Sequence, residues 1–83
     1  MIKVLFFAHL RDLAQINEFS LERGDMVLVR DLLKGMSSKL PLELIEALSD
    51  ETAMVSVNQK YADWGDELPE FAEVGFLPPV SGG

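Results

Sequence analysis

The stretch that decides the fold is Glu-Val-Gly-Phe-Leu-Pro-Pro-Val-Ser-Gly-Gly, residues 73–83. Its first five residues alternate, so that Val74 and Phe76 share one side while Glu73 and Leu77 share the other. This period of two predicts a β-strand with one buried face. We therefore expect a sheet whose last strand directly precedes the tail.

Two consecutive prolines follow this strand. Pro78 and Pro79 lack the N–H that a sheet ladder requires, so the strand must end at Leu77. Prolines also favour an extended course that leads the chain away from the body. The sequence therefore predicts a single domain over residues 1–77 and a tail over residues 78–83.

The tail has properties that suit insertion into another protein. From Pro78 through Val80, Ser81 and Gly82 to Gly83, an extended chain reaches about 20 Å. The two glycines have no Cβ, so they fit a narrow tunnel and leave the terminal carboxylate open to attack. The alternative is a frayed glycine tail without a role.

The N-terminal stretch at residues 2–8 predicts another strand. Alternate positions from Ile2 to Phe6 form an apolar face that suits the core. Leu5 and Phe7 lie on the opposite face. Phe7 is nearest the strand end, and we interpret it either as packing under a loop or as an exposed anchor for a partner.

The remaining elements follow from their hydrophobic periodicity. They are a short helix at 9–14, a strand at 16–22, a main helix at about 28–40 that Pro41 ends, a second helical piece at 42–48, a strand at 53–57, a turn at 58–59, a short strand at 60–62 and a loop at 63–70. This order predicts an α+β fold, with a mixed sheet packed against one main helix. If the sheet is mixed, the last strand lies centrally beside the first, although the order of elements alone does not fix the topology.

Adjacent first and last strands would bring their outward residues together. We therefore predict that Phe7 and Leu77, with Tyr61 near them, form an exposed apolar patch beside the tail. An apolar patch on a small acidic domain indicates a surface for a protein partner.

Composition narrows the function. The chain has 83 residues, is 48% hydrophobic and has no cysteine, which excludes disulfides, cysteine zinc sites and a thiol nucleophile. No stretch approaches the length of a membrane span, and we expect a cytoplasmic protein. His9 stands alone, and Asp63, Asp66 and Glu67 lack calcium-loop spacing, so we expect neither a bound metal nor a bound cofactor.

Charge is unevenly distributed within the net −7. Residues 1–42 hold five acidic and six basic residues, whereas residues 43–83 hold nine acidic residues and one basic residue, Lys60. Nucleic acid needs lysine and arginine on its partner, so this profile argues against nucleic-acid binding. It suits a basic protein partner, or an acidic surface that serves only solubility.

Three stretches carry a resemblance to a known family. Residues 1–8 followed by Arg11, the stretch Val-Ser-Val-Asn-Gln at 55–59 and the ending at 76–83 resemble the small, sulfur-carrying subunit of molybdopterin synthase. That family has the ubiquitin-like β-grasp fold. One departure is Leu28 before Val29, where the family often has a capping threonine.

The resemblance implies a mechanism for the terminal glycine. An E1-like adenylating enzyme would use ATP to activate the Gly83 carboxylate, and a sulfur donor protein would convert it to a thiocarboxylate. The tail would then enter the large catalytic subunit and deliver sulfur to the cyclic pterin precursor. The implied assembly is a heterotetramer, in which this chain is a sulfur-donating cosubstrate and not a stand-alone enzyme.

Other functions stay open at this stage. One alternative is a sulfur carrier for another pathway, such as thiamine thiazole synthesis or tRNA thiolation. The Pro-Pro-Val-Ser segment at 78–81 argues against both. It could instead modify proteins, as ubiquitin does, by joining Gly83 to lysines. The last alternative is a non-covalent interaction domain.

Overall fold

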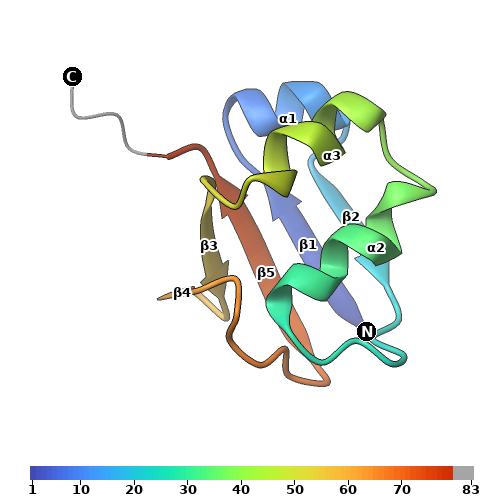
Figure 1. Ribbon diagram of the computed structural model, residues 1–83, viewed down its shortest axis with the longest axis vertical. Coiled ribbons are helices and arrows are strands. Elements are labelled where there is room, and N and C mark those ends of the chain that lie inside the picture. Colours follow the sequence, from blue (N-terminus) through green and yellow to red (C-terminus); the bar gives the residue numbers. More distant parts are fainter. Residues whose placement is uncertain (80–83) are drawn as a thin grey trace.

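The computed structural model describes residues 1–79, in which one mixed sheet has helices on one of its faces (Figure 1). The elements, in chain order, are β1 (Ile2–Phe6), α1 (His9–Ala14), β2 (Glu18–Leu21), the 3-10 turn η1 (Val29–Asp31), α2 (Leu32–Ser37), α3 (Leu42–Ser49), β3 (Met54–Val57), β4 (Lys60–Ala62) and β5 (Ala72–Leu77).

The last strand lies at the centre of the sheet. Within the described residues the strand order is β2-β1-β5-β3-β4, and β1 runs parallel to β5 while the other neighbours are antiparallel. The register pairs Ile2 with Ala72 and Phe6 with Phe76. The predicted α+β class and the adjacency of the first and last strands are therefore confirmed.

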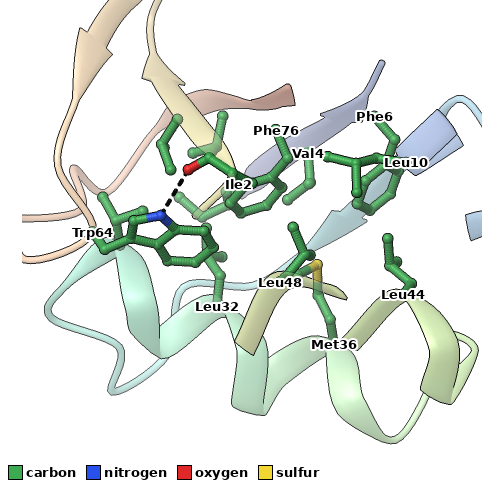
Figure 2. Packing of buried hydrophobic residues seen from close by; sticks show 14 of the residues in the cluster. Ile2, Val4, Phe6, Leu10, Leu32, Met36, Leu44, Leu48, Trp64 and Phe76 are labelled. Carbon is green, nitrogen blue, oxygen red and sulfur yellow. Dashed lines mark hydrogen bonds between the residues drawn. The ribbon is translucent and has the colours of Figure 1, made fainter. Parts of the chain in front are cut away.

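The core lies between the sheet and the helices (Figure 2). The inward positions of β1 and β5 are the ones that alternation predicted, and Val4, Val74 and Phe76 are fully buried. They meet a helical layer that contributes Leu32, Met36, Leu44 and Leu48. Burial of these apolar side chains is the main force that holds the helices on this face.

The helical layer differs from the single main helix that the periodicity predicted. The helix that starts near Leu28 opens with a 3-10 turn, and its α-helical part ends at Ser37. The second piece, α3, is the longer of the two α-helices, with eight residues against six. A short helix gains little stability from its own hydrogen bonds, so packing of the apolar stripe determines where these segments lie.

The loop between β4 and β5 contributes two side chains to the core, which the sequence patterns did not indicate. Trp64 and Leu68 are 7% and 1% exposed. The Trp64 ring stacks on Phe76 with centroids 5.2 Å apart, and its Nε1 donates to the Ala53 carbonyl at 3.0 Å. The predicted loop at 63–70 is thus correct, but this loop also closes one end of the core.

Candidate functional site

The outer face of the sheet is the side opposite the helices. One row of paired residues crosses four strands on this face, from Leu5 on β1 through Gly75 on β5 and Ser56 on β3 to Tyr61 on β4. Small residues occupy the middle of this row. These small residues leave space for the larger side chains of Phe7, Tyr61 and Leu77, which lie at the end of the sheet where β5 continues into the tail.

The backbone around Phe7 holds its side chain on the outer face of the sheet. The Phe7 N–H donates to the Phe76 carbonyl at 3.2 Å, which continues the pairing of the central strands for one residue beyond β1. A tight turn follows, closed by the Leu10 N–H on the Phe7 carbonyl at 3.1 Å. Ala8 has a φ of 53° in this turn, a value that residues other than glycine rarely adopt. The turn holds the Phe7 ring out of the core, 43% exposed.

The structure brings the three patch residues together. Phe7, Tyr61 and Leu77 line one hollow of about 230 Å³, together with Ser56 and Gln59. Tyr61 is 74% exposed, while Leu77 is half-buried. The placement agrees with the predicted patch, and the role of these residues as partner contacts stays a prediction.

A two-residue turn positions the Tyr61 side of the hollow. Asn58 and Gln59 have φ values of 51° and 71°, as a tight hairpin turn with the right-handed strand twist requires. Asn58 also binds β5 twice, because its N–H donates to the Glu73 carbonyl at 2.8 Å and its Oδ1 accepts from the Glu73 N–H at 2.9 Å. These contacts fix the β3–β4 hairpin against the strand that leads to the tail, and the turn predicted at 58–59 is confirmed.

The tail begins at the rim of this hollow. Leu77 lines the hollow and ends β5, Pro78 is half-buried and Pro79 is exposed. The chain therefore leaves the sheet beside the hollow. The predicted insertion and reaction residues Val80, Ser81, Gly82 and Gly83 lie outside the described residues.

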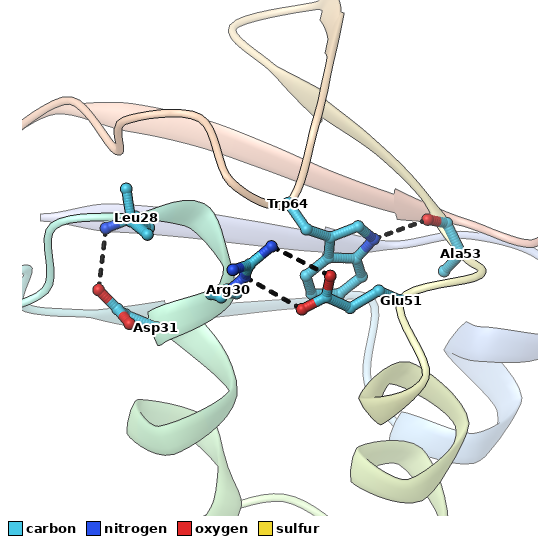
Figure 3. Close-up of polar contacts among 6 residues, drawn as sticks. All are labelled: Leu28, Arg30, Asp31, Glu51, Ala53 and Trp64. Atoms are coloured by element: carbon cyan, nitrogen blue, oxygen red, sulfur yellow. Dashed lines mark hydrogen bonds and ion pairs between the residues drawn. The ribbon is translucent and has the colours of Figure 1, made fainter.

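The five residues that line the hollow are all uncharged, and the shortest ion pair of the described residues involves none of them. Arg30 forms a two-point ion pair with Glu51, with Nε–Oε2 and Nη2–Oε1 distances of 3.1 and 3.2 Å (Figure 3). It joins the start of the helical layer to the segment before β3. An exposed pair of this kind contributes little to stability, so we interpret it as an aid to geometry.

Asp31 provides the reciprocal half of a capping box at the start of the helix, where Leu28 has no side-chain cap. One Asp31 carboxylate oxygen accepts the N–H groups of Val27 and Leu28, each at 2.9 Å. Figure 3 shows the bond from Leu28. These two backbone hydrogen bonds lower the pKa of Asp31 below its ordinary value of 3.8. The predicted lack of a side-chain cap at Leu28 is thus correct. The carboxylate three residues later instead satisfies the N–H groups of Leu28 and the residue before it.

Other candidate groups do not assemble into a site within residues 1–79. His9 is exposed at the start of α1. In the same part of the chain, Asp63, Asp66 and Glu67 belong to no three-ligand group that would hold a metal ion. No helix there has the length and apolar composition that crossing a membrane would need.

A central parallel pair of strands beside one helix-covered face is typical of the ubiquitin-like β-grasp class. The chain belongs to the ThiS family, which it matches over residues 4–83.

Known relatives agree with this class. The chain is 36% identical to the molybdopterin synthase sulfur carrier subunit of Chlamydomonas reinhardtii, over 99% of this chain and 98% of that protein. It is 34% identical to the protein of the same name in Escherichia coli K12, over the whole of both chains. The crystal structure of SAMP1 from Haloferax volcanii shares the fold, with a TM-score of 0.76 at 21% identity over 99% of this chain and 98% of that one. The chain therefore has the ubiquitin-like β-grasp fold.

Proposed function

We propose that this chain is the sulfur carrier subunit of a molybdopterin synthase. The observation that carries the proposal is similarity over essentially the full length to proteins of that name, together with a family match that extends through Gly82 and Gly83. The absence of cysteine in the sequence supports the same chemistry. Without a side-chain thiol, transferable sulfur has to be carried on the terminal carbonyl.

The proposed reaction runs through Gly83 as the end of the chain. A Gly83 carboxylate oxygen attacks the α-phosphorus of ATP in an E1-like adenylating enzyme, and pyrophosphate leaves. The outer sulfur of a persulfide on the donor protein then attacks the acyl carbon and AMP leaves, which gives an acyl disulfide between donor and chain. A second thiol attacks the donor's sulfur in this disulfide, so that the S–S bond breaks, the donor is left as a disulfide with that thiol, and the thiocarboxylate is released. The chain acts as a cosubstrate in each step, and the adenylating enzyme supplies the catalytic groups.

The thiocarboxylate then has to reach the large catalytic subunit. We propose that Phe7, Tyr61 and Leu77 bind that subunit while Pro78 and Pro79 direct the tail into its active site. The hollow at the tail exit supports this, because it exposes apolar surface without charge beside the point where the chain leaves the sheet. The partner, its pairing into a heterotetramer and a cytoplasmic location belong to this proposal.

The experiment is a sulfur transfer assay with intact-mass detection. Incubation with ATP, the adenylating enzyme and a sulfur source is expected to raise the mass of the chain by the difference between sulfur and oxygen. Deletion of Gly83, or addition of one residue after it, should abolish this gain and pterin sulfuration without changing the circular dichroism spectrum. Sulfuration that persists in either variant would refute the mechanism.

The same assay separates the alternatives. Isopeptide adducts on lysines of other proteins, in place of the mass gain from exchange of one oxygen for sulfur, would make the chain a protein modifier. A normal thiocarboxylate that fails to sulfurate the pterin precursor with the large subunit, yet supports thiazole synthesis or tRNA thiolation, would assign the chain to one of those pathways.

A further inference from the structure

Gly75 occupies a position on the outer face where no larger residue fits without displacement of its neighbours. A Cβ built on Gly75 would lie 2.6 Å from Ser56 Oγ and 3.1 Å from Phe7 Cε2. Atoms at these distances must move apart, because carbon contacts are favourable only from about 3.5 Å. The glycine therefore allows the Phe7 ring and the Ser56 hydroxyl to approach the strand from both sides.

The same position controls the shape of the hollow. The Gly75 Cβ would meet Phe7, Ser56 and also Leu77, whose Cδ1 lies 3.9 Å away, and all three line the hollow. Gly75 itself is buried beneath them. A methyl group added there would push two walls of the hollow, so the absence of a side chain is part of how the hollow is built.

The size and chemistry of the hollow indicate what it accepts. Its volume of about 230 Å³ lies below the range of about 300–1,000 Å³ typical of small-molecule sites. Two of its walls are aromatic, from Phe7 and Tyr61, and none of its lining residues is charged. These properties fit one large uncharged side chain that a protein partner inserts, which is how energetically important interface residues are commonly bound.

We propose that Gly75 keeps open a socket for one large uncharged side chain of the catalytic subunit. The socket is lined by Phe7, Ser56, Gln59, Tyr61 and Leu77. The proposal rests on the proposed function, which supplies the subunit that receives the tail. Leu77 lines the socket and directly precedes Pro78 and Pro79, where the tail begins. We therefore assign the inserted side chain to the protein that receives the tail. Its inserted side chain fixes the position of the carrier while the tail extends into the active site.

The test is a titration of the catalytic subunit with labelled carrier variants. Gly75→Ala places a methyl group between the socket walls, and Ser56→Val fills the socket from β3 with a residue that favours strands. We expect each to raise the Kd about tenfold or more. Gly65→Ala is the matched control, because its Cβ would meet only Arg30 Nη2 at an ordinary 3.5 Å. This control should bind as the unsubstituted protein does.

Melting temperatures and circular dichroism accompany each titration, so that a loss of binding is not confused with unfolding. Weaker binding by folded Gly75→Ala and Ser56→Val, together with an unchanged control, supports the socket. Should Gly75→Ala fail to fold, Ser56→Val alone decides. Unchanged Kd values for the folded variants overturn the socket and leave the proposed function intact, whereas the proposed function itself fails if the unsubstituted carrier does not bind the subunit.

Discussion

The two faces of the sheet use the same alternation for different purposes. On the inner face, Phe6 and Phe76 are 2% and 0% exposed and their rings stack with centroids 6.2 Å apart. On the outer face, their chain neighbours Phe7 and Leu77 line an open hollow. A core side chain and a surface side chain are thus direct neighbours in the sequence. A small domain can therefore keep its stability on one face and leave the other free for binding.

The largest expected effect is a difference in the free energy of unfolding between substitutions on the inner and the outer face. Phe76→Ala removes a fully buried ring that stacks on both Phe6 and Trp64, and we expect a loss of about 3–5 kcal/mol. Leu77→Ala, one residue later, should cost less than about 1 kcal/mol. Urea unfolding followed by Trp64 fluorescence measures both. Equal losses at the two positions would show that the outer face also supports the fold.

The next largest effect is expected on the affinity for the catalytic subunit, which the outer face is proposed to bind. Phe7→Ala should weaken binding of the catalytic subunit by about 2 kcal/mol, roughly thirtyfold in Kd, because exposed aromatic residues often dominate interface energies. Phe71→Ala provides the control: this phenylalanine is 77% exposed but precedes β5, at the end of the strand opposite Leu77. A Phe7→Ala protein that unfolds, or a loss of binding in the control of similar size, would contradict the assignment of the docking surface.

The strands and their inward faces were predictable because alternation with a period of two is a local signal. Val74 and Phe76 needed only their neighbours in sequence to be assigned to the core. The patch also followed from the sequence, since parity placed Phe7 and Leu77 outward and the adjacency of first and last strands placed them together.

The register between neighbouring strands and the burial of irregular segments were not predictable from local patterns. The contact of Gly75 with Ser56 arises from the β3–β5 register, which no local pattern specifies. Trp64 enters the core from a loop without periodicity, so its burial leaves no trace in the pattern. The early end of α2 was not predictable either. The apolar stripe in the sequence continues to Leu40, whereas the backbone leaves the helix after Ser37.

The smallest expected effect lies at the edge of the helical layer, where Asp31 binds two backbone N–H groups. Its pKa is lowered from 3.8 chiefly by the hydrogen bond from Leu28 and next by that from Val27. A carboxylate with a depressed folded-state pKa contributes stability that is fully present above the unfolded-state pKa. That contribution is lost as the pH falls below 3.8 through the lower folded-state value.

Two substitutions separate the charge of Asp31 from its hydrogen bonds. Asp31→Asn keeps an oxygen that can accept the N–H groups but loses the charge, whereas Asp31→Ala loses both. We expect melting temperatures a few degrees lower at pH 7, with the alanine variant lower than the asparagine variant. The gap between the unsubstituted protein and Asp31→Asn should stay constant down to about pH 5 and close below pH 3.8. Asp50, whose pKa is also lowered by hydrogen bonds from Thr52, is present in all three proteins and cancels in the comparison. A gap that persists unchanged at pH 3 would mean that the charge of Asp31 does not stabilise this end of the helix.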